Sequence, residues 1–473
     1  MDQFSGESMN RSLFVLFSLA LFILSSCSEL AKKPEATSAS ERPTINLDVK
    51  KWELDNGLRL LVIEDNTLPI MSYYTFYEVG GRHEGPGTTG ATHFLEHMMF
   101  RGSKNYPPQV FDSTIEKLGG STNAYTNFDM TVYYESLPSA HLKRMIEMEA
   151  DRVKGLLLVP ELVEKERQVV FEERKMRYEN SPDGKLYLRM MQEVFKDTPY
   201  GGSVIGEVED LKKLTPDNLR SFHDKFYVPN NMVIVIAGDV DADDVYSLVK
   251  DNFSDIPKAE NLKELKSQND DKQKYAFKTK NIAKEIKLNG TSRTPLFMYA
   301  FQGLPIGPRE SYVMDILSSV IGDGESSWLN QTLVKTRYPQ LSSVYASNYT
   351  LQHNGVFFIG GELSNKYSLS RFKSNLNNLI KKNMCDQAVT ERTVQKTKNQ
   401  YLIGFFEGLK TNAGVAHFAG LRESFFGDYK EYKKEIEIYE NITTSEVKDA
   451  CRKYLESAEG IFISIWDKNK ETN

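Results

Sequence analysis

The chain has 473 residues, of which 40% are hydrophobic and 26% are charged. A chain of this length can bury a substantial core and should form more than one domain. The formal net charge of −6, with lysines and acids mixed along the chain, excludes the basic surface that nucleic-acid binding requires.

The N-terminal segment, residues 1–27, has the pattern of an export signal. Arg11 precedes an apolar run over 13–24, which is too short to span a bilayer comfortably but suits a signal peptide. Leu24-Ser25-Ser26-Cys27 then resembles the bacterial lipobox, whose cysteine receives a diacylglycerol. The alternative is an ordinary cleaved signal with a chance cysteine.

A lipobox predicts a mature chain that begins at Cys27 and is attached to a membrane by lipid. Residues 28–45 are polar and are predicted to be a flexible tether. Ser28, in place of aspartate, favours the outer membrane of a bacterial envelope, with the protein facing the periplasm.

Two further cysteines, Cys385 and Cys451, lie in the second half of the chain. They could in principle pair, but two cysteines are too few to indicate a disulfide framework. We therefore expect two buried thiols.

Hydrophobic periodicity in the first half predicts a sheet with long helices. Strands are expected at 58–64, 71–79, 121–127, 130–137 and 232–237. Helices are expected at 89–101, 107–118, several within 139–195, 216–227 and 241–253. Residues 257–285 are highly charged, lack a core face in sequence and are predicted to be a linker.

The second half repeats this order. Strands are expected at 296–302, 342–350, 355–363 and 460–466, and helices at 309–321, 326–336 and onwards to 455. Residues 214–239 also align without a gap on 442–467, although chance agreement of two helix–strand units is an alternative. The pattern predicts an α+β fold of two similar domains, 46–256 and 286–473, each an antiparallel-rich sheet covered by helices.

The clearest chemical signal is the motif His93-Phe94-Leu95-Glu96-His97. Residues four apart share one face of a helix, so His93 and His97 can both present a ring nitrogen to one ion. Glu96 projects beside them without having to be a ligand. Since the chain has only seven histidines, this spacing favours a metal site over two histidines that are merely packed.

A catalytic zinc normally has three protein ligands and one open position. We expect the third ligand to be a carboxylate on another helix, and the best candidate helix spans 161–174. Glu166 and Glu173 are seven residues apart and share one face, whereas Glu172 points about a quarter-turn away. The residues alone do not choose among these acids, and each could be surface charge.

With this motif the chain resembles the pitrilysin/insulinase family of zinc metallopeptidases, which includes mitochondrial processing peptidase. The motif itself is the inverted H-x-x-E-H signature of inverzincins. The likeness covers residues 46–467 and is more specific at the zinc motif than in the C-terminal half.

The resemblance assigns roles to five residues. In that family the third ligand is a glutamate about 75 residues downstream of the motif, and Glu173 stands 76 after His97. The resemblance therefore implies one Zn2+ per chain, held by His93, His97 and Glu173. It also implies that Glu96 is the catalytic base and that Glu166 is a second acid that supports the site.

The segment 119–126 resembles the edge strand on which the family lays its substrate. The resemblance implies that the substrate contacts Asn123, Ala124 and Tyr125. Other matching segments, such as 227–232, are interpreted as turns and core.

One departure concerns an arginine and a tyrosine, seven residues apart, that self-sufficient members of the family carry in their second half. The matching stretch here is 333–344, where Val334 and either Ser342 or Ser343 occupy those positions. Arg337 is a candidate substitute, but it is misaligned. The family forms a clamshell of two halves, each of two α+β domains, and this chain supplies one half. The departure implies a heterodimer with a homologous half that has the Arg/Tyr pair but lacks the zinc motif; a homodimer is the alternative.

Together these patterns predict a zinc-dependent endopeptidase that hydrolyses peptides or unfolded segments held as an added β-strand in a closed chamber. Two alternatives from other classes remain. One is a non-catalytic or partner-dependent subunit of an envelope complex, and the other is a zinc-dependent peptide-binding module without turnover.

Overall fold

The computed structural model describes residues 45–267, 275, 284–364 and 367–467, and Leu47–Asn473 form one compact unit. The predicted signal peptide, Cys27 and almost all of the tether at 28–45 lie outside the described residues. Within the described part of the chain, no helix is long and apolar enough to cross a membrane.

The first sheet has six strands in the order β1-β2-β6-β3-β5-β4. Their bounds are β1 Lys50–Glu53, β2 Arg59–Glu64, β3 Ile70–Tyr77, β4 Ser121–Thr126, β5 Thr131–Pro138 and β6 Met232–Gly238. The pair β2–β6 is parallel and the other neighbours are antiparallel. β6 (MVIVIAG) is buried along its whole length, as expected for a central strand covered on both faces.

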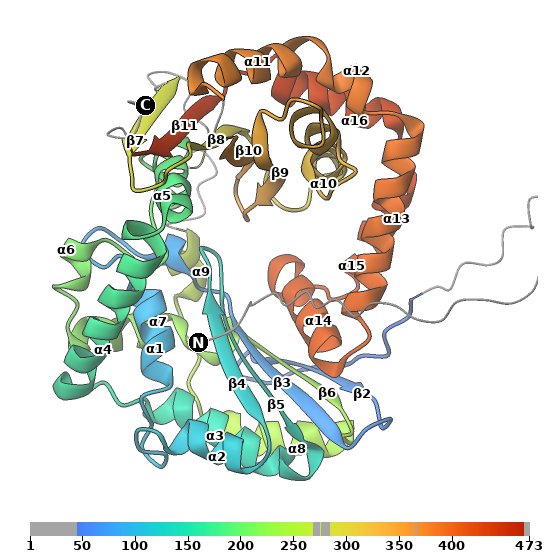
Figure 1. The fold of residues 1–473 in the computed structure, drawn as a ribbon. Coiled ribbons are helices and arrows are strands. Elements are labelled where there is room, and N and C mark those ends of the chain that lie inside the picture. The colour runs from blue at the N-terminus through green and yellow to red at the C-terminus, as the bar shows by residue number, and fades with distance from the viewer. Residues whose placement is uncertain (1–44, 268–274, 276–283, 365–366, 468–473) are drawn as a thin grey trace, which may run out of the picture. The chain divides into compact units, whose positions relative to one another are not determined.

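The second sheet has five strands in the order β7-β11-β8-β10-β9. Their bounds are β7 Glu285–Asn289, β8 Leu296–Gln302, β9 Leu341–Thr350, β10 Gly355–Leu363 and β11 Ile461–Trp466. The pair β7–β11 is parallel and the other neighbours are antiparallel. Leaving out β1, the two sheets have the same order and strand directions, which confirms the prediction of two similar α+β domains (Figure 1).

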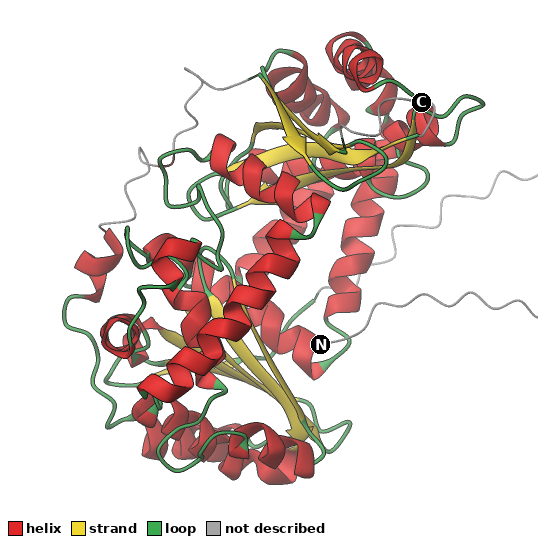
Figure 2. Cartoon of the chain, turned by 60° about the vertical axis from the view of Figure 1, so that its left-hand side comes forward, coloured by secondary structure: helices red, strands yellow, loops and turns green. Residues whose placement is uncertain are grey.

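The helices of the first half are α1 Ala91–Met99, α2 Val110–Lys117, α3 Leu142–Gly155, α4 Pro160–Arg174, α5 Pro182–Val194, α6 Val208–Leu211, α7 Pro216–Phe226, α8 Ala242–Phe253 and α9 Leu262–Ser267. Those of the second half are α10 Arg309–Gly322, α11 Leu369–Lys382, α12 Met384–Ala388, α13 Glu391–Gly408, α14 Asn412–Phe426, α15 Glu431–Asn441 and α16 Thr444–Cys451. Short 3-10 and π turns are η1 Gly81–His83, η2 Ser139–His141, η3 Lys175–Glu179, η4 Pro229–Asn231, η6 Asn330–Val334 and η7 Arg452–Glu456. Figure 2 shows helices packed against both sheets.

The internal alignment also holds in atomic detail. Thr215 is the N-cap of α7 and Thr443 is the N-cap of α16. Each forms a capping box with the residue three positions later. These helices lead into β6 and β11, which occupy equivalent places in the two sheets. The match between 214–239 and 442–467 therefore reflects a repeated structural unit.

Two helices pack on the sheet of the other half. α5 contacts β8 and β11 of the second sheet, whereas α14 contacts β3 and β6 of the first. α14 lies so close that a Cβ at Gly420 would be 2.1 Å from a ring carbon of Phe76. The domain boundaries at 256 and 286 stay predictions. Each half of the chain nevertheless contributes one helix to the core of the other half.

The linker at 257–285 stays a prediction, but the expectation that this segment lacks a core face is wrong in part. Leu262–Ser267 form α9, and Leu262 lies in the core of the first half with Leu265 packed against it. Lys266 forms an ion pair with Glu78 at 2.6 Å. The one lysine and one glutamate between the two leucines, within a charged segment, conceal this short apolar face in the sequence. Residues 268–274 and 276–283 lie outside the described part.

The prediction of two buried thiols is wrong as well. Cys385 and Cys451 are buried, as expected, but they form a disulfide with a Cα–Cα distance of 5.6 Å. α12 carries the first cysteine and packs on α16, which carries the second. The number of cysteines in a sequence cannot show this tertiary proximity.

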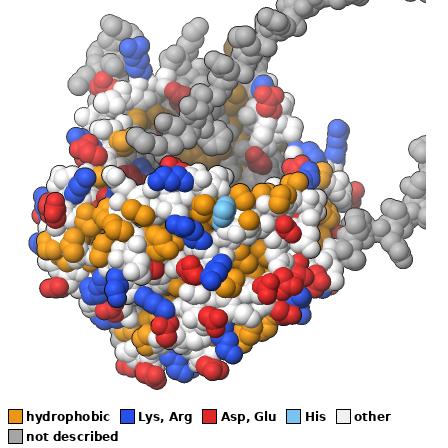
Figure 3. Space-filling view, turned by 90° about the horizontal axis from the view of Figure 1, so that it is seen from below, with side chains coloured by type: hydrophobic (Ala, Val, Ile, Leu, Met, Phe, Trp, Pro, Cys, Tyr) orange, Lys and Arg blue, Asp and Glu red, His pale blue; other side chains and the backbone are white. Residues whose placement is uncertain are grey.

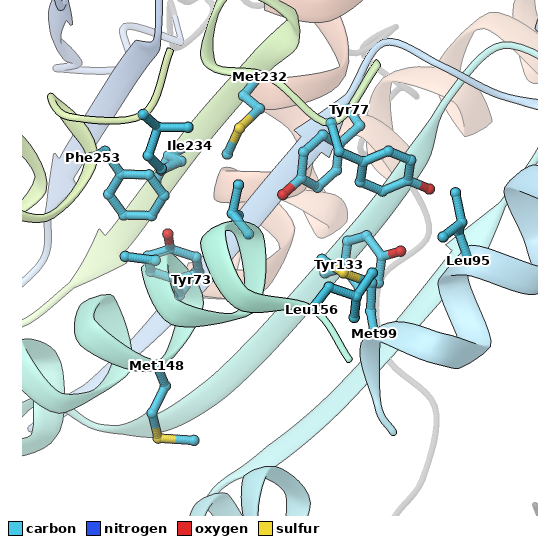
Figure 4. Packing of buried hydrophobic residues seen from close by; sticks show 14 of the residues in the cluster. Tyr73, Tyr77, Leu95, Met99, Tyr133, Met148, Leu156, Met232, Ile234 and Phe253 are labelled. Carbon is cyan, nitrogen blue, oxygen red and sulfur yellow. The ribbon is translucent and has the colours of Figure 1, made fainter. Parts of the chain in front are cut away.

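The core of the first half fixes α1 against its sheet. Figure 4 shows Leu95 and Met99 of α1 beside Tyr77 and Tyr133 of the strands, all fully or almost fully buried. The opposite side of α1 is left for polar groups. On the outer face in Figure 3, acidic and basic side chains are mixed, in agreement with the small net charge of −6.

Candidate metal centre

Helix α1 begins at a turn that requires glycine. Gly90 has φ of +87°, and a Cβ at this position would lie 2.2 Å from the carbonyl oxygen of Ile205. The backbone N–H groups of Gly90 and Thr92 donate to the two carboxylate oxygens of Glu84, each at 2.7 Å. Burial raises the pKa of Glu84 to about 8, although these hydrogen bonds act in the opposite direction. The start of the helix is thus fixed two residues before His93.

The two histidines of α1 face a carboxylate of α4. The rings of His93 and His97 are one turn apart, with centroids separated by 4.7 Å. Glu173 Oε2 lies 3.5 Å from Nε2 of His93 and 3.1 Å from Nε2 of His97. α1 and α4 are in contact and lie side by side (Figure 1). The structure therefore brings together the three groups that the sequence separates by up to 80 positions.

Glu166 and Glu173 each contact one of the two ring nitrogens of His97. Glu166 Oε1 lies 2.8 Å from Nδ1, while Glu173 faces Nε2. Both acids share one face of α4, as their spacing of seven predicts. Glu172 is exposed and points away, with 71% of its side chain accessible. The structure thus separates the three acids that the residues alone left open.

The charges around His97 favour a cation. Burial would lower the pKa of His97, but its hydrogen bonds to Glu166 and Glu173 raise that pKa to about 9. Burial would raise the pKa of Glu173, yet the two histidines hold it well below its ordinary value. The carboxylates of Glu166 and Glu173 therefore favour a positive charge at His97.

This donor set fits zinc. Donor atoms bound at about 2.0–2.2 Å to a tetrahedral zinc lie about 3.3 Å from one another, close to the observed 3.1 and 3.5 Å. All three donor groups lie within 4.8 Å of one another. The carboxylate of Glu166 on Nδ1 of His97 is the second contact that metal-binding histidines usually make. The Nδ1 of His93 is buried and has no hydrogen-bond partner among the described residues.

Glu96 lies beside this centre and faces the edge strand. The hydroxyl of Thr126 donates to Glu96 Oε2. Thr126 ends β4, which pairs with β5 and is the outermost strand of this sheet in the described part of the chain. The predicted substrate residues Asn123 and Ala124 belong to the same strand, and the Ala124 N–H donates to Asn123 Oδ1 at 2.8 Å. Glu96, the three candidate donors and the outer edge of β4 are therefore adjacent.

A cavity of about 480 Å³ adjoins the centre between α1, α2 and β4. Its walls come from these three elements, at Glu96, His97, Phe100, Arg101, Asp112, Glu116, Gly120, Ser121, Thr122 and Asn123. The cavity has room for a side chain of a peptide laid along β4.

The sequence interpretation did not include two arginines that hold the acids of the centre. Arg101 donates to Glu166, with Nη2 at 3.0 Å from Oε1. Arg177 Nη2 lies 2.9 Å from Glu173 Oε1. Each arginine stands four residues after a centre residue, His97 or Glu173. The same helical spacing that identified the histidines could have identified both.

Residues 333–344 of the second half, which depart from the family pattern, do not take part in the candidate metal centre. Arg337 and Tyr338 are exposed, with the guanidinium carbon 5.4 Å from the ring centroid. They line a separate cavity of about 690 Å³ together with Ser342 of β9. Among the described residues, no contact joins Arg337 to the candidate metal centre.

Comparison with known proteins agrees with this fold. Residues 61–208 match the model of the insulinase family (peptidase family M16), and residues 213–401 match that of the peptidase M16 inactive domain. The zinc protease PqqE of Helicobacter pylori is 29% identical over 385 residues, 80% of this chain and 82% of that protein. The uncharacterized zinc protease YmxG of Bacillus subtilis is 25% identical over 406 residues, 85% of this chain and 95% of that protein.

Solved structures show the same fold. A protease from Helicobacter pylori superposes with a TM-score of 0.78 at 24% identity, covering 89% of this chain and 100% of that one. The periplasmic protease PqqL of Escherichia coli gives a TM-score of 0.69 at 19% identity, covering 90% of this chain but 48% of PqqL. In extent, the chain thus corresponds to about one half of PqqL.

The fold and the donor set define a class: a two-domain α+β protein with a candidate zinc centre of the inverted H-x-x-E-H type. The two matches name the family within that class. The chain belongs to the pitrilysin/insulinase family, peptidase family M16.

Proposed function

We propose that the protein is a zinc-dependent endopeptidase whose zinc, one per chain, is held by His93, His97 and Glu173. The observation that carries the proposal is this donor set, assembled from two helices at the spacing that zinc requires, beside an acid that is not a donor. The family and the names of the relatives PqqE and YmxG as zinc proteases support the same activity.

The residues around the centre would divide the work of hydrolysis. A bound zinc would lower the pKa of its water and polarise the peptide carbonyl. Glu96 takes the proton of the attacking water and later delivers it to the leaving nitrogen. The hydrogen bond from Thr126 keeps the Glu96 carboxylate beside the edge strand. Glu166 holds Nδ1 of His97 and so keeps Nε2 directed towards Glu173.

The proposed substrates are peptides or unfolded segments in an extended conformation. β4 has no strand on its outer side among the described residues, so an extended peptide can join the sheet by main-chain hydrogen bonds. Asn123, Ala124 and Tyr125 would then contact the substrate. A closed chamber formed with a second half would restrict entry to chains without stable folded structure.

The second half is proposed to come from another chain. Support comes from PqqL, of which this chain covers 48%, and from the absence of the Arg/Tyr pair in residues 333–344. A heterodimer with a homologous half that carries the pair and lacks the zinc motif would complete the site; a homodimer is the alternative. The match of residues 213–401 to an inactive domain keeps a partner-dependent or non-catalytic subunit of an envelope complex as the competing function.

We propose that Cys27 carries a lipid and anchors the protein in the outer membrane, facing the periplasm. The lipobox-like Leu24–Cys27 stretch supports this, and the Cys385–Cys451 disulfide suits an oxidising compartment. Labelled palmitate should enter the unaltered chain but not Cys27→Ser. Labelling of both would refute the anchor.

The experiment for the proposed activity compares Glu96→Gln with Glu172→Gln. Cleavage of a fluorogenic peptide library is measured with and without a chelator, for the chain alone and with a homologous half. Glu96→Gln should retain zinc and lose about a hundred- to ten-thousand-fold in turnover, the usual contribution of a general base. Glu172→Gln should behave as the unaltered chain. Full activity of Glu96→Gln removes Glu96 from the mechanism, and zinc-loaded chains that never cleave establish the non-catalytic alternative.

A further inference from the structure

The outer strand of the first sheet is held by a residue that lies 292 positions away in the chain. Tyr125, on β4, has its hydroxyl 2.8 Å from Nε2 of His417, on α14. The two rings meet edge to face with centroids 5.9 Å apart. This contact joins the strand proposed to bind substrate to a helix that belongs, by sequence, to the second half.

α14 is a firm support for this contact. Ala416 and Ala419 are fully buried against the first sheet, and Gly420 leaves no room for a side chain next to Phe76. Any substituent there would push the helix away from the sheet. The position of α14, and of His417 with it, is therefore set by close packing and not by the hydrogen bond itself.

The ring of His417 sits in an aromatic surround. Its centroid lies 5.8 Å from that of Tyr74 and 6.1 Å from that of Phe76, both on β3. Burial and the nearby Arg422 lower the pKa of His417, so the ring is neutral and can accept a hydrogen bond from the Tyr125 hydroxyl. Burial also raises the pKa of Tyr125, which keeps its hydroxyl protonated.

The edge strand is thereby tied from both faces. Side chains of successive strand residues point to opposite faces: Thr126 reaches Glu96 on the side of α1, and Tyr125 reaches His417 on the side of α14. An outer strand lacks the second neighbour that would otherwise fix its position. The two contacts supply that restraint at adjacent residues, directly beside the candidate metal centre.

We propose that His417 is a positioning residue. It holds Tyr125 and thereby keeps the outer edge of β4 in the position at which a bound peptide contacts the metal centre. The proposal rests on the proposed peptidase function. It assigns to α14, a helix of the second half, a role in substrate affinity at the centre of the first half.

The test compares Tyr125→Phe, His417→Leu and their combination. Each single change should raise KM for an extended peptide about five- to tenfold, as expected for one lost hydrogen bond, with kcat changed less than about twofold. The double variant should match the single variants, because either change breaks the same contact. His417→Gln, which keeps an acceptor, should restore KM towards its original value, and Tyr134→Phe should leave it unchanged.

Amide hydrogen exchange of residues 121–126 separates this proposal from the peptidase function. If the unaltered, zinc-loaded chain cleaves no peptide, the proposed function fails, yet exchange still reports on the strand. Faster exchange in His417→Leu than in the unaltered chain supports the positioning role. Equal exchange overturns it, as does a double variant whose KM change is the product of the two single changes.

Discussion

The two sheets share their strand order from the parallel pair outwards, but the helices that follow their equivalent strands differ in chemistry. α1, which follows β3, turns two histidines towards α4, and its Glu96 faces β4. Most residues of α10, which follows β8, are buried, and most of these buried residues are apolar. The comparison teaches that the repeated fold supplies the scaffold, whereas a few polar positions on one helix and its neighbour supply the chemistry.

The halves also differ in what stabilises them. The second half has the disulfide Cys385–Cys451 between α12 and α16. Replacing both cysteines with alanine should lower the free energy of unfolding by about 2–4 kcal/mol, because the loop of the unfolded chain is no longer closed. Denaturant unfolding measures this, and zinc content serves as the control, since the centre lies in the other half. Unchanged stability, or a parallel loss of zinc, would break the comparison.

A buried acid on α10 gives the second half a pH dependence of its own. Burial raises the pKa of Asp315 to about 6, while Asn348 and Tyr439 donate to its two oxygens at 2.8 Å each. A folded pKa above the unfolded value means that the contribution of Asp315 to stability is fully present below about pH 4 and is lost as pH rises through about 6. Asp315→Asn should remove this fall.

The expected gain of Asp315→Asn at pH 7 is about 1–3 kcal/mol, with no gain at pH 4, from about 1.4 kcal/mol per unit of pKa. Thermal unfolding at both pH values checks it. Glu172→Gln, an exposed acid on α4, is the control and should show no such difference. A gain of equal size at both pH values would show that the charge of Asp315 is not its cause.

How much of this could be predicted depends on sequence separation. The histidine pair and the shared face of Glu166 and Glu173 follow from helical spacing, and the similarity of the two domains follows from the repeat. The approach of Cys385 to Cys451 and of His417 to Tyr125 depends on how helices pack across 66 and 292 positions, and no local pattern encodes it. The family resemblance, not periodicity, singled out Glu173 from its neighbouring acids.

The smallest expected effects concern two helix N-caps, at which the two halves of the molecule are most alike. Thr215 and Thr443 cap equivalent helices with equivalent capping boxes. Alanine at either position should cost about 1 kcal/mol of stability, and serine should restore most of it. Unfolding of the two alanine variants under the same conditions provides the measurement. A cost of several kcal/mol at one site only would mean that the two units are not energetically equivalent.

The central claim is that His93, His97 and Glu173 hold one zinc. The most direct measurement is the zinc content per chain of the purified protein, of Glu173→Gln and of the matched neighbour Glu172→Gln. The account predicts about one ion per chain, as in sites with this donor set, for the unaltered protein and for Glu172→Gln, and almost none for Glu173→Gln. Full zinc content in Glu173→Gln would contradict the account.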